Sequence, residues 1–226
     1  IGGEAALRAA ASLRKEILEV AAALLQSTTE NLDIVDGEII VSGHGTRMSL
    51  AEFGETVFFR SGELADGMHP GLVHTSRFRV RDYVFTNGIH GCYVEIDIET
   101  GFVRVLDYWS VEDCGRIINP LLVAEQVRGA VVQGLGDALY EHCIYDPSGQ
   151  LTNGTLADYL VPMACEMPEI TTVHVETPTS ASNLGAKGAG ESGTAAAPGA
   201  VLSAVNDALG ALGARIDAIP ITPEDV

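Results

Sequence analysis

The sequence predicts an α+β fold in which helices pack on mixed or antiparallel sheets. Some stretches repeat apolar residues at helical spacing, and others alternate apolar with polar residues as strands do. Short turns join alternating stretches as hairpins, which requires antiparallel pairing. The chain has 226 residues, 46% of them apolar and 19% charged, enough for the core of one large domain or two small ones. We expect residues 1–226 to form a single domain.

The chain begins with a predicted helix over residues 4–25, where alanine and leucine recur at helical spacing without proline. Residues 32–41 then alternate around Asp36-Gly37, a pair that accepts the positive φ angles of a tight hairpin turn. These features predict a helix followed by a β-hairpin.

A second, shorter helix is predicted to begin at Ser49 and to end near Phe59. Ser49 followed by Glu52 resembles a capping box, in which the two residues satisfy free N–H groups of the first turn. A polar stretch containing glycine follows over residues 61–71. The sequence predicts no regular element there.

Two long antiparallel strands are predicted over residues 75–85 and 92–109. The second turns over at residues 99–101, and Val94 and Ile96 alternate with acidic neighbours. Asn119-Pro120 then opens a predicted helix running to about Tyr140. Four further elements are predicted in order: a turn at residues 146–149, a short helix over 155–164, a strand over 170–175 and a last helix over 195–212.

The net charge of −18 excludes nucleic acid and anionic membranes as favoured partners. No apolar run approaches the roughly 20 residues that span a membrane, and the first 25 residues do not follow a signal-peptide pattern. An acidic, solvated surface on a cytoplasmic protein is the expectation.

Cysteine and histidine spacing gives no support to a metal site held by this chain. The cysteines are widely spaced, without the C-x-x-C pairs of zinc or iron–sulfur sites, and we expect them to be buried free thiols. No two histidines are four residues apart, and His90, between glycines before a strand, is interpreted as structural. The residues are Cys92, Cys114, Cys143 and Cys165, and His44, His69, His74, His90, His142 and His174.

The most informative stretch is residues 185–194, where Glu191 lies among four glycines. Glycine lets the backbone approach a ligand closely, and Pro198 is expected in the first turn of the following helix, whose N-terminus favours anions. A phosphate-binding P-loop is excluded, because Lys187 comes too early and Glu191 would repel a phosphate. A lone carboxylate on such a loop is a candidate general base facing a bulky, anionic cofactor.

The helix after Asn119-Pro120 carries three glycines within residues 126–136, at a cost of roughly 1 kcal/mol each relative to alanine. Gln126 and Gln133 share one face of it, and their amides suit the edge of a heterocycle such as a pterin. The alternative is tight helix packing with two solvated glutamines. Asp113, at the end of the preceding strand, could bind a ligand but is more typical of a turn or cap carboxylate.

Several motifs in order resemble the C-terminal part of the molybdopterin-binding subunit of the xanthine dehydrogenase, aldehyde oxidase and carbon monoxide dehydrogenase family. The similarity extends over essentially the whole chain. The motifs are Gly3-Glu4-Ala5, Val94-Glu95-Ile96-Asp97 with Thr100-Gly101, Asp113-Cys114-Gly115 with Ile118-Asn119-Pro120, and residues 126–136 and 187–191.

The resemblance implies roles for particular residues. The family's glutamate beside the molybdenum, which acts as general base, corresponds to Glu191. The segment whose backbone contacts the pterin corresponds to Lys187, Gly188, Ala189 and Gly190. The resemblance also matches Gln126 to a glutamine that bonds to the pterin, and Gln133 to a supporting position.

The implied activity is hydroxylation of a small molecule with water as the oxygen source. Burial in a cramped loop would strengthen the Glu191 carboxylate as a base. The implied cofactor is molybdenum–molybdopterin, in the cytosine dinucleotide form for a bacterial enzyme. Electrons would leave through iron–sulfur and FAD centres on partner chains or domains, because this chain lacks their cysteine spacings.

Family members carry several hundred further residues, including the N-terminal half of the cofactor-binding subunit. We therefore expect this chain to be a fragment or split subunit that is inactive alone. The residues that would choose among aldehydes, N-heteroaromatics, purines and carbon monoxide mostly lie outside it. The competing interpretation is a non-catalytic scaffold or assembly domain that retains the fold.

Overall fold

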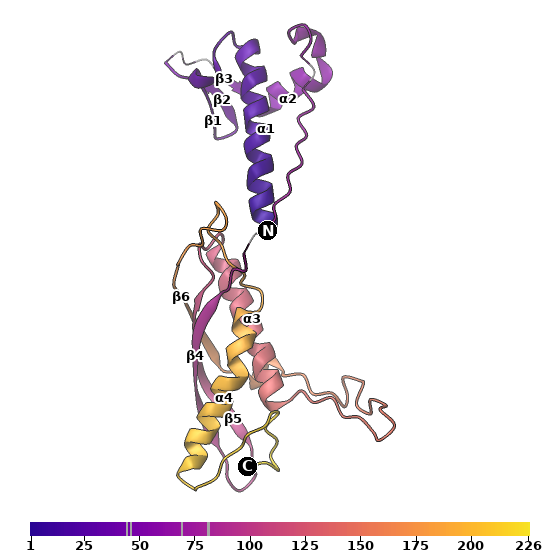
Figure 1. The fold of residues 1–226 in the computed structure, drawn as a ribbon, viewed down its shortest axis with the longest axis vertical. Coiled ribbons are helices and arrows are strands. Elements are labelled where there is room, and N and C mark those ends of the chain that lie inside the picture. The colour runs from indigo at the N-terminus through magenta and orange to yellow at the C-terminus, as the bar shows by residue number, and fades with distance from the viewer. Residues whose placement is uncertain (44, 46, 69, 81) are drawn as a thin grey trace. The chain divides into compact units, whose positions relative to one another are not determined.

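The protein is described by a computed structural model, which covers residues 1–43, 45, 47–68, 70–80 and 82–226. The chain forms two compact units, Ile1–Val80 and Arg81–Val226. Each unit has its own buried core. Figure 1 shows the helices and strands of both units.

The first unit combines two helices with a small antiparallel sheet. Its elements are α1 (Gly2–Leu24), β1 (Leu32–Val35), β2 (Glu38–Val41), β3 (Arg47–Ser49) and α2 (Leu50–Phe59), with strand order β1-β2-β3. Positive φ angles of 49° at Asp36 and 81° at Gly37 confirm the predicted hairpin turn. The backbone N–H of Glu52 donates to Ser49 Oγ at 3.1 Å, so Ser49 caps α2 as expected.

The predicted strand over residues 75–85 is wrong: the part of this segment that the structure describes pairs with no other strand. Phe78 lies under Arg8 of α1, with the guanidinium carbon 4.7 Å from the ring centroid. This extended segment therefore contacts helix α1 through Phe78. Its alternating apolar and polar residues marked an extended backbone, but not one that pairs with another strand.

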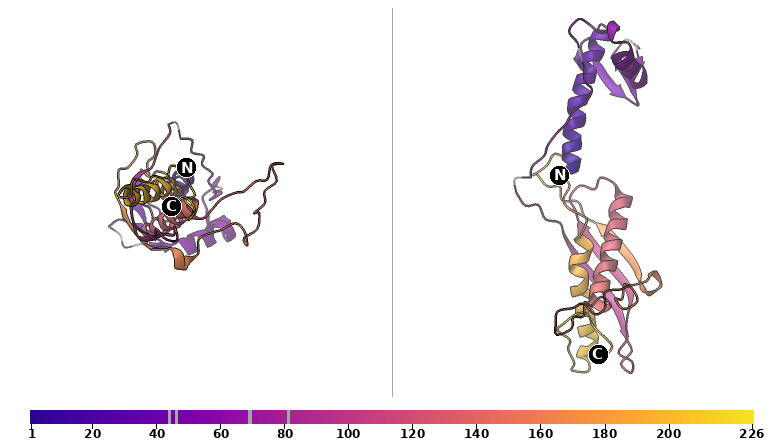
Figure 2. Two further views of the ribbon diagram at one scale, coloured as in Figure 1. Left: turned by 90° about the horizontal axis from the view of Figure 1, so that it is seen from below. Right: turned by 90° about the vertical axis from the view of Figure 1, so that its right-hand side faces the viewer.

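The second unit is a three-stranded sheet covered on one face by two helices (Figure 2). Its elements are β4 (Asn87–Ile96), β5 (Val103–Asp113), α3 (Pro120–Leu139), β6 (Glu169–His174) and α4 (Ser192–Gly210). β4 pairs antiparallel with β5 and β6 pairs parallel to it, which confirms the mixed sheet. Strand β4 begins at Asn87, five residues before the start at Cys92 that the sequence predicts.

The helices α3 and α4 cross at glycines. A Cβ added at Gly134 of α3 would lie 2.6 Å from the Cβ of Ala197, and one at Gly193 of α4 would lie 2.5 Å from the carbonyl oxygen of Val127. Two of the glycines at this crossing are therefore explained by close helix packing. Pro198 lies inside α4, not in its first turn as expected.

The opposite face of this sheet is exposed and carries apolar as well as charged side chains. Neighbouring strands place exposed side chains there, at Ile89, Tyr93, Trp109, Val111 and Val173. The covered face carries the alternate residues, among them the fully buried Tyr108. The sheet thus has one buried and one bare face.

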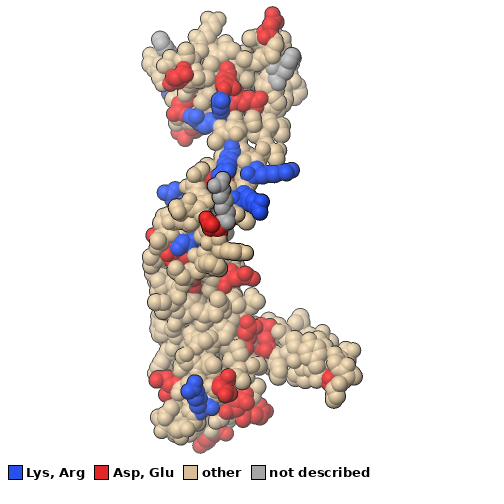
Figure 3. All heavy atoms as spheres, in the orientation of Figure 1, with Lys and Arg blue, Asp and Glu red and all other residues tan. Residues whose placement is uncertain are grey.

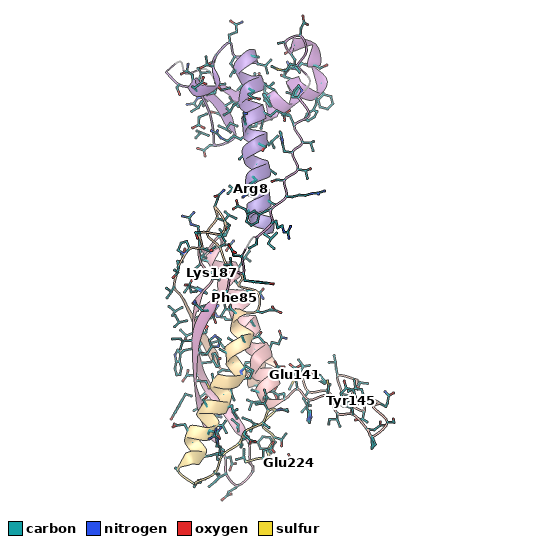
Figure 4. All side chains as sticks on the ribbon, in the orientation of Figure 1. Arg8, Phe85, Glu141, Tyr145, Lys187 and Glu224 are labelled. Carbon is teal, nitrogen blue, oxygen red and sulfur yellow. The ribbon has the colours of Figure 1, made fainter. Side chains whose placement is uncertain are left out.

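An extended arm over residues 141–164 leaves the second unit after α3, with Glu141 at its base and Tyr145 farther out (Figure 4). The predicted turn at residues 146–149 is confirmed, because Gly149 donates its N–H to Asp146 and has a φ of 85°. The predicted helix over residues 155–164 is wrong. Leu156 and Leu160 are 84% and 58% exposed, so a helix here would gain little from packing, and residues 155–163 form bends, turns and irregular backbone before a 3-10 turn at Ala164–Glu166.

The charge distribution of the arm differs from that of the body. Residues 141–164 include no lysine or arginine, and Figure 3 shows the arm with a few acidic and many uncharged side chains. No helix among the described residues is long and apolar enough to cross a bilayer.

Candidate functional site

The candidate site is built at the end of β5, where Asp113-Cys114-Gly115 leads out of the sheet. The backbone N–H of Gly115 donates to Asp113 Oδ1 at 2.8 Å, which makes Asp113 the predicted turn carboxylate. Its side chain also accepts from the backbone N–H of Thr177 at 3.1 Å. Hydrogen bonds from Thr177, foremost its hydroxyl, and from Gly115 and Lys187 hold the pKa of the Asp113 carboxyl well below its usual range, against a desolvation effect that raises it.

The glycine-rich loop begins against this turn. Arg116 donates its N–H to the carbonyl oxygen of Gly185 at 3.0 Å, and Lys187 donates its N–H to that of Cys114 at 2.7 Å. The ammonium of Lys187 lies 3.1 Å from Asp113 Oδ2. The first half of the loop is therefore held by the strand end, and the Lys187 side chain is engaged in an ion pair.

The second half of the loop is held by α3. Gln126 Nε2 donates to the carbonyl oxygen of Gly190 at 2.8 Å. The predicted glutamine and the predicted loop are thus brought together, although they are 64 residues apart. Gln133 is exposed farther along α3, and among the described residues no hydrogen bond joins it to the loop.

Glu191 is the N-cap residue of α4, with a φ of −120° and a ψ of 10°. Its side chain makes no capping hydrogen bond to the helix. The side chain is exposed, which contradicts the expected burial in a cramped loop. The described residues therefore do not shield Glu191 from water.

Beside Glu191 lies an open pocket of about 400 Å³. The loop from Gly188 to Ser192 and the first turn of α4 form one wall, and β4 and β5 form the other. A Cβ added at Gly188 or Gly190 would meet no described heavy atom within 4 Å. The backbone of the loop is consequently open to a ligand at these two positions.

His90 and Glu112, which line this pocket, form a buried hydrogen-bonded cluster with Tyr108 that the sequence did not predict. His90 Nε2 lies 2.5 Å from Glu112 Oε1, and His90 Nδ1 lies 2.7 Å from the Tyr108 hydroxyl. Burial, together with nearby Cys92 and Glu112, raises the pKa of Tyr108. A purely structural role for His90 stays a prediction, since His90 and Glu112 also line the pocket. The polar residues at alternate positions 108, 110 and 112 are the sequence signal that could have found its partners.

Gly88 leaves room for this cluster, because a Cβ there would lie 2.5 Å from Glu112 Oε2. Among the described residues, no three histidine, cysteine, aspartate or glutamate side chains are placed to hold a metal ion. His44 and His69 lie outside the described residues.

The cysteines are all free, but the expectation that all are buried is wrong. Cys114 is buried and Cys92 half-buried, whereas Cys143 and Cys165 are exposed on and beside the arm. Burial raises the pKa of the Cys92 thiol to about 11.

A known protein family matches most of the chain. Residues 1–168 match the family described as "Molybdopterin cofactor-binding domain". The chain belongs to this family. The matched residues include Gln126 and Asp113, and the loop carrying Glu191 follows them.

Individual relatives of this molybdopterin cofactor-binding chain are named as a hydroxylase, an oxidoreductase and a dehydrogenase. It is 42% identical to the nicotine 6-hydroxylase large subunit of Paenarthrobacter nicotinovorans, over 100% of this chain and 28% of that protein. The structure of quinoline 2-oxidoreductase from Pseudomonas putida 86 matches with a TM-score of 0.84 and 41% identity, over 96% of this chain and 28% of that one. A Cu,Mo-CO dehydrogenase structure matches with a TM-score of 0.85 and 25% identity, over 99% and 28% of the two chains.

The chain therefore spans little more than a quarter of the length of the relatives that it matches. The α+β fold and the resemblance to molybdenum hydroxylase cofactor-binding subunits are confirmed.

Proposed function

We propose that residues 1–226 are the C-terminal part of the molybdopterin-binding subunit of a molybdenum hydroxylase, with Glu191 as its general base. The observation that carries this proposal is the position of Glu191. Glu191 is the N-cap residue of α4 and lines the pocket. The loop that precedes it is held at one end by Lys187 and at the other by Gln126.

The described residues fit a pterin cofactor at this loop. Gly188 and Gly190 leave space where side chains would stand, and the N-terminus of α4 favours an anionic group. The Gln126 amide nitrogen holds Gly190, and its amide oxygen, an acceptor, is the group we assign to the pterin. We assign cofactor binding to Gln126 and to the backbone of Lys187, Gly188, Ala189 and Gly190.

The reaction consumes a substrate C–H bond and water and yields a C–OH group, two electrons and two protons. When bound, the molybdenum cofactor supplies the redox centre for the two electrons. Glu191 accepts one of the protons, and its backbone is placed at the pocket as the N-cap of α4. Residues outside this chain complete the pocket and exclude water.

An N-heteroaromatic compound is the substrate class that the comparisons favour. The nicotine and quinoline enzymes are 42% and 41% identical to this chain, compared with 25% for the carbon monoxide enzyme. We further propose the cytosine dinucleotide form of the cofactor. The N-terminal half of the subunit and partner chains carrying iron–sulfur clusters and FAD would complete the enzyme, in keeping with the share of the relatives that the chain covers.

The deciding experiment replaces Glu191 by Gln in the complete enzyme and measures kcat together with molybdenum per subunit. We expect kcat to fall by at least about a hundredfold with molybdenum retained, because a positioned base contributes that much. Glu95→Gln, which changes an exposed carboxylate on β4, is the matched control and should leave kcat unchanged.

Unchanged turnover in Glu191→Gln would remove Glu191 as the base. Absence of molybdenum from the native enzyme, in a host that loads a related enzyme, would favour the alternative of a non-catalytic scaffold domain.

A further inference from the structure

Asp113 joins three segments that are far apart in the sequence. Asp113 is the last residue of β5. Its carboxylate accepts hydrogen bonds from the backbone N–H groups of Gly115 and of Thr177, which follows β6, and it forms an ion pair with Lys187 of the glycine loop. The side chains of Asp113 and Lys187 are each only 11% exposed. This is unlike the exposed ion pairs of the same unit, such as Arg104 with Glu95 at 69% and 60%.

The geometry leaves the loop little freedom at this point. Lys187 is fixed by its backbone N–H to Cys114 and by its ammonium to Asp113. Gly115 has a φ of 69°, and a Cβ there would collide with the carbonyl oxygen of Gly185. The loop therefore lies directly against the turn, and Gly115 is the residue that permits this contact.

The Lys187 ammonium is directed at the strand end and is not part of the pocket lining. Lys187 lies at the end of the second unit opposite Glu224, where the loop leaves the sheet (Figure 4). The Lys187 ammonium thus already has a carboxylate partner, Asp113, within the protein.

The loop has its second attachment at Gly190, where Gln126 donates to the carbonyl oxygen. Gly188 and Ala189 lie between the two attachments, and Glu191 follows directly. Moving Lys187 therefore moves the open stretch of backbone and the base that follows it.

We propose that Asp113 and Lys187 form a clamp that positions residues 188–191, so that both are positioning residues for Glu191 and neither side chain contacts the cofactor. This inference rests on the proposed function, since it concerns the placement of the proposed base. It assigns the Lys187 side chain to the protein and leaves only its backbone to the cofactor.

The test compares Lys187→Met, Lys187→Arg, Asp113→Asn and the double variant Asp113→Asn/Lys187→Met in the complete enzyme. Each is measured for kcat, KM and molybdenum per subunit. We expect Lys187→Met to lower kcat about ten- to a hundredfold with KM and molybdenum content near wild type, because small displacements of a catalytic group have effects of this size. Lys187→Arg restores the charge and should recover most of the kcat.

The double variant should be about as slow as Lys187→Met alone, since both substitutions remove the same contact. Arg104→Met, which breaks the exposed pair with Glu95, is the control and should leave kcat unchanged. Where Lys187→Met yields no folded enzyme, Asp113→Asn decides instead, because the amide keeps an oxygen for the Gly115 N–H and still weakens the ion pair.

Wild-type kcat in Lys187→Met or Asp113→Asn, alongside an inactive Glu191→Gln, overturns the clamp and leaves the proposed function standing. Loss of molybdenum in Lys187→Met that Lys187→Arg does not restore also overturns it, since it assigns the ammonium to the cofactor. Full activity in Glu191→Gln contradicts the proposed role of Glu191 as the base, whatever the result for Lys187→Met.

Discussion

The side-chain amide of Gln126 donates to the carbonyl oxygen of Gly190, the residue directly before Glu191, at 2.8 Å. Helix α3 thereby holds the last glycine of the loop, and the candidate base begins α4 immediately afterwards. Helices α3 and α4, which pack against each other at Gly134 and Gly193, therefore also fix the C-terminal end of the loop between Lys187 and Glu191.

Replacing Gln126 by Met should weaken cofactor retention, because it removes the bond to Gly190 and the amide oxygen proposed for the pterin. One lost hydrogen bond corresponds to about 1 kcal/mol, or roughly a fivefold weaker hold. Molybdenum per subunit after dialysis measures this in the complete enzyme. Gln133→Met is the matched control on the same helix, and equal losses in both variants would contradict a specific role for Gln126.

Replacing Gly134 by Ala should destabilise the second unit by about 1–3 kcal/mol, because the new methyl group would meet Ala197 at 2.6 Å. Gly129→Ala, in the same helix, meets no described atom within 4 Å and should stabilise by up to about 1 kcal/mol through helix propensity. Urea denaturation of the two variants measures the difference. Equal effects at the two positions would show that the helix crossing has room to relax.

The stabilising contribution of Asp113 should depend on pH in a defined direction. Its pKa is lowered in the folded chain, so its contribution is fully present above the unfolded value near 4 and is lost as the pH falls through the folded value. The free energy of unfolding of wild type should therefore exceed that of Asp113→Asn at pH 7, and the gap should narrow below about pH 4. Denaturation curves at several pH values test this, and a gap that widens in acid would contradict it.

Thiol reagents should distinguish two classes of cysteine. Cys143 and Cys165 are exposed and should react quickly at pH 8, whereas Cys92, with a pKa of about 11, is almost entirely protonated there. Burial also raises the pKa of the Cys114 thiol. A colorimetric thiol assay should show a fast phase that a Cys143→Ser/Cys165→Ser variant lacks; persistence of that phase would place a core cysteine within reach of solvent.

The elements predicted correctly are those whose signals are local. Ser49 and Asn119 cap their helices through bonds to residues three positions later, so a short window contains the whole signal. Asp36-Gly37 likewise specifies its own turn. The segments over residues 75–85 and 155–164 were predicted wrongly because pairing and packing depend on distant partners, such as Arg8 beneath which Phe78 lies.

The same distinction applies to the site. The resemblance assigns Gln126 and the loop before Glu191 to one cofactor site, and the structure brings them together through the bond to Gly190. That Gln126 bonds to a pterin stays a prediction. The sequence could not predict that Lys187 turns towards Asp113, because that pairing depends on how the sheet and the loop meet. The burial expected for Glu191 was inferred from glycine content alone, whereas exposure is set by all the segments around the loop.

The bare face of the β4-β5-β6 sheet provides a built-in optical probe. Trp109 is the sole tryptophan in the 226 residues, and its half-exposed indole lies on that face beside Val111. Indole emission from the chain therefore reports the hydration of this one surface. Any polypeptide that covers it shifts the emission to shorter wavelength and shields it from quenchers, so assembly can be followed without a label.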